Sequence, residues 1–150
     1  MSTPLIKSLQ ILALLFALCY TSSKANLAVV LEQPVVTPST NVVATMVHLT
    51  FPPGDLGSDP HTHPGPVVGY VLEGEFLFQK NKDPLRILKA GDTFYENEGD
   101  VHVWSANASN STTCKVLATL MGRPGEPILT FVKDYPRISR EEALKIALNK

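Results

Sequence analysis

The sequence predicts an all-β domain, a sandwich or barrel, that ends in one short α-helix. Short runs rich in β-branched and aromatic residues recur along the chain, and segments rich in Gly, Pro, Asn and Asp separate them. Runs at this spacing indicate antiparallel strands in a sandwich or barrel and not βαβ units. The expected strands are residues 41–51, 67–74, 75–80, 85–91, 93–96, 101–106 and 115–122.

The first 25 residues are expected to be a secretory signal peptide. Lys7 precedes an unbroken apolar run over residues 11–20, and small residues precede the bond after Ala25. The run is short for a transmembrane helix, so a membrane anchor or a buried element of the fold is the weaker interpretation. We therefore expect a β-domain over residues 26–138 and a protein that is secreted or lies in the lumen of the secretory pathway, including the vacuole.

The charge balance of the chain is mild. The formal net charge is −1, and it becomes −3 when Lys7 and Lys24 leave with the signal peptide. No basic stripe is present that could neutralise phosphates, so we expect neither nucleic acid nor, after cleavage, a membrane as partner. Cleavage also removes Cys19, which leaves Cys114 alone in an alternating stretch, where we expect a buried core thiol.

The C-terminal residues 139–150 are expected to form a helix that packs on the outside of the barrel. Ser139 and Glu142 have the spacing of a capping box, and helix-favouring residues follow them. Leu144 and Leu148 would form the apolar stripe of this helix. A contact between two copies of the chain is the alternative use of the stripe.

Two overlapping sequons predict N-glycosylation if the protein passes through a eukaryotic secretory pathway. Asn107 begins the first sequon and Asn110 begins the second. Because the two overlap so closely, we expect at most one of them to carry a glycan. Asn110, in a polar turn, is the better candidate.

Three of the four histidines predict a metal site. His61 and His63 are one residue apart, so their side chains project to the same face of an extended strand. His102 would arrive from another strand. Neutral imidazole nitrogen is the commonest protein ligand for zinc, iron, copper and nickel. A mononuclear metal site is therefore the leading hypothesis, and a metal-free binding pocket is the alternative.

The segment from Gly54 to Gly74 resembles the first conserved motif of the cupins, G-x5-H-x-H-x3-4-E-x6-G. His61 and His63 fall on the two histidines of that motif and Gly74 on its closing glycine, while Gly54 stands one residue too early. The resemblance covers about residues 42–121 and implies a double-stranded β-helix, also called a jelly-roll barrel.

The segment from Gly91 to Asn107 resembles the second cupin motif, G-x5-P-x-G-x2-H-x3-N. Gly91, Gly99 and His102 match this motif, Asn97 replaces its proline, and Asn107 arrives one position late. Two separate motifs in the expected order strengthen the resemblance.

Val67 is the main departure from the cupin pattern, because the motif has a glutamate there that is usually the fourth protein ligand. The resemblance therefore implies His61, His63 and His102 as the only protein ligands. This is similar to the three-histidine cupins, which include iron dioxygenases of thiols or diketones, and unlike the manganese oxalate enzymes and germins. Three neutral imidazoles leave the charge of the ion uncompensated, so we expect an anionic ligand to join it. Open coordination positions are typical of a catalytic site.

Two side chains are expected to line the substrate pocket. Val67 takes the place of the family's glutamate, and Trp104 lies two residues after His102, which on a regular strand is the same face. The indole of Trp104 could equally fill the barrel core.

Other residues are candidates for catalytic or supporting roles. His48 lies in a strand, in phase with Met46, and is a candidate extra ligand or general base, with an ordinary core or rim position as the alternative. Tyr70 and Tyr95 are candidate phenol donors. Glu96 is a candidate carboxylate that orients a histidine from outside the ligand set.

The resemblance implies a small-molecule enzyme, most directly a metal-dependent oxidoreductase or dioxygenase with Fe(II), or with Zn, Ni or Mn as alternative metals. The expected substrate is a small anionic or enolisable metabolite, since small cupins resembling this one occur in secondary-metabolite biosynthesis. A non-redox decarboxylase, cyclase or isomerase is the first alternative, and a metal-free ligand-binding protein is the second. A homodimer is also expected, because cupins often pair through exposed strands.

Overall fold

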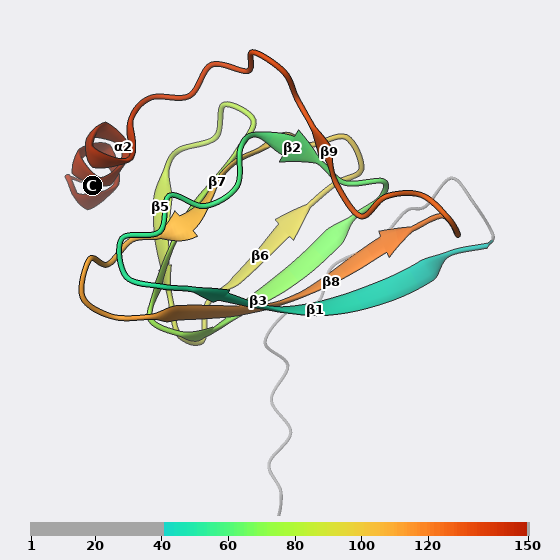
Figure 1. Ribbon diagram of the computed structural model, residues 1–150, viewed down its shortest axis with the longest axis horizontal. Coiled ribbons are helices and arrows are strands. Elements are labelled where there is room, and N and C mark those ends of the chain that lie inside the picture. Colours follow the sequence, from blue (N-terminus) through green and yellow to red (C-terminus); the bar gives the residue numbers. More distant parts are fainter. Residues whose placement is uncertain (1–40, 150) are drawn as a thin grey trace, which may run out of the picture.

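Two antiparallel β-sheets pack face to face in the computed structural model, which describes residues 41–149 (Figure 1). The four-stranded sheet has the order β1-β8-β3-β6, and the five-stranded sheet has the order β5-β4-β7-β2-β9. The strands are β1 (Val43–Phe51), β2 (His61–Thr62), β3 (Val67–Glu73), β4 (Glu75–Lys80), β5 (Arg86–Lys89), β6 (Thr93–Glu96), β7 (His102–Asn107), β8 (Cys114–Gly122) and β9 (Thr130–Phe131). The predicted signal peptide, residues 1–25, lies outside the described residues.

The predicted all-β fold class is confirmed, and every expected strand is present within a residue or two of its predicted ends. The arrangement of the strands is that of a double-stranded β-helix. Two strands were missed, β2 and β9, and each contains only two residues. They pair with each other, and β2 also pairs with β7. These short pairings close one end of the five-stranded sheet around the histidine segment.

The inner core lies between the two sheets and follows the two-residue period of the strands. On β3, for example, Val67 and Val71 face inward and are buried, and Val116 faces them from β8. Cys114 belongs to the same core and is fully buried, as predicted. Burial disfavours the thiolate and raises the pKa of Cys114 to about 11.

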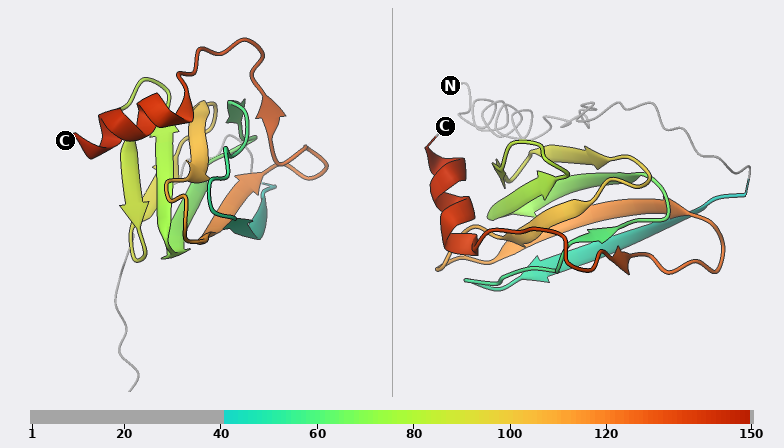
Figure 2. Two further views of the ribbon diagram at one scale, coloured as in Figure 1. Left: turned by 60° about the vertical axis from the view of Figure 1, so that its left-hand side comes forward. Right: turned by 90° about the horizontal axis from the view of Figure 1, so that it is seen from above.

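A second, outer core covers the other face of the five-stranded sheet, so β7 is buried along its whole length. Helix α2 (Arg140–Leu148) packs there at one end of the molecule (Figure 2). Its N-cap is Ser139, whose Oγ accepts a hydrogen bond from the backbone N–H of Glu142 at 3.2 Å. No helix among residues 41–149 has the length and apolar character needed to cross a membrane.

The apolar face of α2 differs from the predicted stripe of Leu144 and Leu148. Ala143 is the buried residue of the helix, and Leu144 and Ala147 are partly buried beside it. Leu148 is 72% exposed. The small side chains of Ala143 and Ala147 allow the helix to approach the sheet closely, while the side chain of Leu148 extends into solvent.

The chain crosses from the five-stranded to the four-stranded sheet between β2 and β3, and Gly65 permits that crossing. A Cβ on Gly65 would lie 1.7 Å from the backbone oxygen of Met121. The same approach lets the backbone N–H of Met121 donate to the carbonyl of Pro66 at 3.0 Å. His63 follows the last residue of β2 and lies two residues before Gly65, so this crossing helps to fix the position of His63.

Asn107 is a polar anchor buried at the end of β7. Its Nδ2 donates to the carbonyl oxygens of Phe51, Pro52 and Thr112, at 3.1, 3.0 and 2.7 Å. Its Oδ1 accepts from the backbone N–H of Ser109 at 2.9 Å. The side chain therefore joins the end of β1 to the loop before β8, and it is fully buried.

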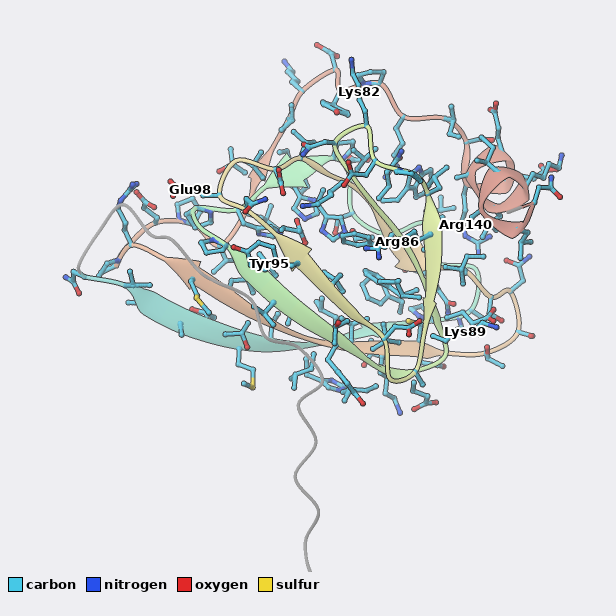
Figure 3. The ribbon with its side chains drawn as sticks, turned by 180° about the vertical axis from the view of Figure 1, so that it is seen from behind. Lys82, Arg86, Lys89, Tyr95, Glu98 and Arg140 are labelled. Atoms are coloured by element: carbon cyan, nitrogen blue, oxygen red, sulfur yellow. The ribbon has the colours of Figure 1, made fainter. Side chains whose placement is uncertain are left out.

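Arg140, at the start of α2 (Figure 3), fastens the helix to the same loop. Its guanidinium donates to the backbone oxygen of Asn107, at 2.6 and 3.0 Å, and to Oδ1 of the exposed Asn110 at 2.9 Å. Of the two sequon asparagines, Asn110 thus lies at the surface while Asn107 lies in the interior.

Replacing Asn107 by Ala should lower the free energy of unfolding by about 2–4 kcal/mol, because several buried carbonyls and one N–H lose their partner. Urea denaturation followed by circular dichroism measures the change. Asn110→Ala, at an exposed position, is the matched control and should cost less than about 1 kcal/mol. Equal losses for the two variants would contradict the anchoring role of Asn107.

Candidate metal centre

His61, His63 and His102 converge inside the barrel, at the end that β2 and β9 close. His61 lies directly opposite His102 in the pairing of β2 with β7, and His63 follows β2. One ring nitrogen from each of the three lies within 4.8 Å of the others. The centroid of the His61 ring lies 4.9 Å from the centroid of the His63 ring and 5.1 Å from that of the His102 ring.

Backbone carbonyls set the tautomer of two of these imidazoles. Nδ1 of His61 lies 2.7 Å from the carbonyl oxygen of Asp59, and Nδ1 of His63 lies 2.8 Å from that of Ile128. Because a carbonyl oxygen only accepts, both Nδ1 atoms must donate, and each neutral ring then has its lone pair on Nε2. Burial lowers the pKa of His61 to about 4, so this ring is neutral at pH 7.

Glu96 shares the interior with the three histidines. Its Oε1 lies 3.1 Å from Nδ1 of His102, and its Oε2 lies 3.8 Å from Nε2 of His63. Burial of this carboxyl favours the neutral acid, but the imidazoles, above all that of His102, outweigh it and hold the pKa of Glu96 below its ordinary value. The group is therefore a carboxylate near neutral pH, buried beside the candidate ligands.

Several polar atoms of this cluster are buried without a hydrogen-bond partner among the described residues. They are both carboxylate oxygens of Glu96 and Nε2 of His102. Buried polar atoms are nearly always paired in folded proteins, so a group of unpaired polar atoms at one point needs an explanation. Imidazole nitrogen and carboxylate oxygen are ligands of zinc, iron and other divalent metals, and such an ion would satisfy these atoms together. The residues present therefore fit a divalent metal.

The cluster opens into a cavity of about 130 Å³ between the two sheets. Apolar side chains from β1, β3, β4, β6 and β8 form most of its wall, and Ile128 and Leu129, before β9, complete it. Besides the three histidines and Glu96, the polar residues that line the cavity within the described range 41–149 are Ser58 and Ser105, and no Lys or Arg of that range lines it. A cavity of about 150 Å³ holds benzene, so this one suits a ligand of a few heavy atoms.

Val67 lines this cavity, as predicted, but Trp104 does not. Trp104 belongs to the outer core, where the guanidinium carbon of Arg137 lies 4.4 Å from the centre of its ring. A β-bulge explains the difference, since Gln79 pairs with Trp104 while the next residue of β4 pairs with His102. The extra residue, Val103, shifts the side-chain alternation, so His102 and Ser105 face the cavity and Trp104 faces outward.

Three other candidates also lie away from the cluster. His48 is exposed, because on β1 it is Val47 and Leu49 that face the cavity. Tyr70 is the half-buried neighbour of the inward-facing Val71 on β3. Tyr95, labelled on β6 in Figure 3, likewise alternates with the inward Phe94 and Glu96. None of His48, Tyr70 and Tyr95 lines this cavity, and a catalytic role for them stays a prediction.

No sequence pattern indicated the part played by the segment before β9. The carbonyl of Ile128 orients His63, and Phe131 pairs with His61 in the ladder between β2 and β9. A backbone carbonyl carries no residue signature, and a two-residue strand has no periodicity. In the sequence, Glu96 could be recognised only as a carboxylate near the second motif. Its position beside the imidazoles depends on how the two sheets pack together.

Comparison with known proteins supports the same family. Residues 47–120 match the family model of the cupin domain. No curated protein gives a significant match. A cupin-like protein from Thermotoga maritima is 24% identical with a TM-score of 0.54, over 71% of this chain and 75% of that one, which shows a shared fold.

Two further solved structures match this chain with lower TM-scores. A predicted oxalate decarboxylase from Thermotoga maritima is 30% identical with a TM-score of 0.43, over 50% of this chain and 63% of that chain. The DMSP lyase DddQ from Ruegeria pomeroyi is 21% identical with a TM-score of 0.46, over 66% of this chain and 47% of that chain. The fold, the family match and the two histidine motifs agree, and the domain described here is a small member of the cupin superfamily with a three-histidine cluster in its barrel.

Proposed function

We propose that this protein is a metal-dependent cupin enzyme that acts on a small anionic or enolisable metabolite, with iron(II) as the favoured metal. The observation that carries the proposal is the convergence of His61, His63 and His102 on one point of a largely apolar cavity of small-molecule size. Zinc, nickel and manganese use the same donor atoms, so the fit to a divalent ion does not depend on iron.

Bound iron(II) would supply reducing electrons for O2 chemistry, whereas zinc or nickel would supply a Lewis acid for a non-redox reaction. The chain's own residues do the rest. The carbonyls of Asp59 and Ile128 hold the Nδ1 atoms of two imidazoles and so fix the direction of those rings, and the apolar wall from β1, β3 and β8 limits the access of water to the ligand. Ser58 and Ser105 offer neutral hydroxyl donors to a polar group of the substrate.

The charge of the cavity favours a singly charged substrate. A divalent ion beside the Glu96 carboxylate leaves one net positive charge, where the sequence had led us to expect two. In the part of the chain that the structure describes, no Lys or Arg lines the cavity to balance the second charge of a dianion. A monoanion with a short apolar remainder, such as an enolate, a thiolate or a monocarboxylate, matches both the charge and the wall.

We also propose that the protein works in the secretory pathway or outside the cell, as the N-terminal sequence suggests. The exposed side chain of Asn110 is accessible to a glycosyltransferase, and this accessibility supports the proposal. Asn107 is an unsuitable acceptor once the domain has folded, because its Nδ2 is buried and already donates to three carbonyls.

Adding Zn²⁺ or Co²⁺ to the metal-free protein should raise its melting temperature. An ion at 100 times its Kd stabilises by about 2.7 kcal/mol, which corresponds to roughly 10 °C for a domain of this size. Differential scanning calorimetry measures the shift. His102→Ala should abolish it and the matched control His48→Ala should retain it. A wild-type protein that responds to no divalent metal would overturn the proposed function.

The iron(II)-loaded protein should consume O2 when a small enolate or thiolate is supplied. An oxygen electrode measures the uptake across a panel of such compounds, and His61→Ala should remove it because one ligand is lost. Product formation without oxygen consumption would instead favour the non-redox decarboxylase, cyclase or isomerase. A protein that binds metal but converts no compound of the panel would contradict the enzyme proposal.

The metal-loaded protein should bind monoanions more tightly than dianions of similar size. We expect at least a tenfold preference for the acetylacetone enolate over malonate, because the cavity offers one net positive charge. Perturbation of the Co²⁺ absorption spectrum during titration gives both affinities. Equal affinities would mean that the charge of Glu96 does not act at the site.

A further inference from the structure

We propose that Glu96 is a direct ligand of the metal ion, and that it supplies from β6 the carboxylate that Val67 does not supply from β3. The inference rests on the proposed metal site and adds a fourth protein ligand to it. The carboxylate has moved to the neighbouring strand and has not been lost.

The strand register brings the two positions together. Val67 and Glu96 are direct partners in the pairing of β3 with β6. Both are buried and both line the cavity. The Cβ atoms of directly opposed residues lie about 4.5–5.5 Å apart on one face of the sheet. A glutamate side chain is long enough to reach the same part of the cavity from either strand.

The environment of Glu96 calls for a cation. The residue is 1% exposed, and neither carboxylate oxygen has a hydrogen-bond partner among the described residues. Among residues 41–149, no Lys or Arg lines the cavity. A buried carboxylate without an aligned hydrogen-bond donor is costly, and the Nδ1 atoms of His61 and His63 already donate to backbone carbonyls. A divalent ion held by the histidines would meet this need.

The Glu96 carboxylate lies close enough to the histidine cluster to share one ion with it. Metal–ligand distances near 2.1 Å allow two ligand atoms of one ion to lie up to about 4.2 Å apart. Oε2 of Glu96 lies 3.8 Å from Nε2 of His63, the ring nitrogen that carries the lone pair, and this distance is within that limit. Oε1 lies 3.1 Å from Nδ1 of His102, so the carboxylate lies beside the ring whose Nε2 is buried without a partner.

A role in orienting His102 explains the geometry less well. His61 and His63 show what such an orienting contact looks like here, with aligned hydrogen bonds of 2.7 and 2.8 Å to carbonyl oxygens. Oε1 of Glu96 approaches Nδ1 of His102 only to 3.1 Å, in a less well aligned contact. This contact is therefore both longer and less well directed than the other two.

The test compares Co²⁺ binding by the wild-type protein, Glu96→Gln, and the double variant Val67→Glu/Glu96→Val. Gln keeps the shape and an oxygen that can accept from an imidazole N–H, but it removes the charge. The double variant returns the carboxylate to β3. Glu98→Gln, in the loop after β6 (Figure 3), is the matched control because Glu98 lies at the surface, near Arg123. Competition with a chelator gives the affinity, and circular dichroism verifies folding.

We expect Glu96→Gln to weaken Co²⁺ binding at least 100-fold and to change the visible absorption of the saturated Co²⁺ protein. The double variant should recover at least tenfold of that loss, and Glu98→Gln should match the wild type. A loss below tenfold, or an unchanged spectrum, would overturn the inference while leaving the three-histidine site and the proposed function intact. A wild-type protein that binds no metal would overturn both.

Discussion

A carboxylate buried beside three imidazoles is the interaction on which the interior of this domain depends. The Glu96 side chain is almost fully buried, and its charge must be balanced where water does not reach. The neighbouring histidines stabilise the charged form, and they hold the carboxyl pKa below its ordinary value despite burial. The two sheets, the apolar wall and the closure by β2 and β9 all surround this one group of polar atoms.

The fold was largely predictable because its strands follow local rules. The two-residue period of β3 and β8 identified which side chains pack between the sheets, and Ser139 marked the start of α2. The side-chain directions in β7 were not predictable. A bulge depends on the pairing between β4 and β7, and one extra residue was enough to move Trp104 from the cavity to the outer core.

The candidate site was predictable where the spacing of residues along a strand determines the direction of their side chains. His61 and His63 share a face, and the second motif supplied His102, so the sequence named all three members of the cluster. The carboxylate was harder to identify, because its position depends on which residue of β6 pairs with Val67. A carboxylate on a paired strand can lie beside the same cavity as one on the motif strand. A motif that covers only one strand does not detect that carboxylate.

The chemistry of the cavity follows from its wall as much as from its donors. Apolar side chains leave a ligand few partners besides the histidine cluster and two serine hydroxyls. Selectivity then rests on size and total charge, which small changes at the wall would alter without disturbing the strands. The outer core, with α2 and Trp104, stabilises the five-stranded sheet from behind and is separate from this cavity.

The contact between His63 and Ile128 joins residues 65 positions apart in the chain. The ring of His63 is therefore aimed by a carbonyl that is synthesised long after the histidine itself, and β9 adds its pairing to β2 later still. The first motif therefore does not by itself determine the direction of all its histidines. The geometry of the cluster becomes complete only when a segment that follows both motifs has packed against it.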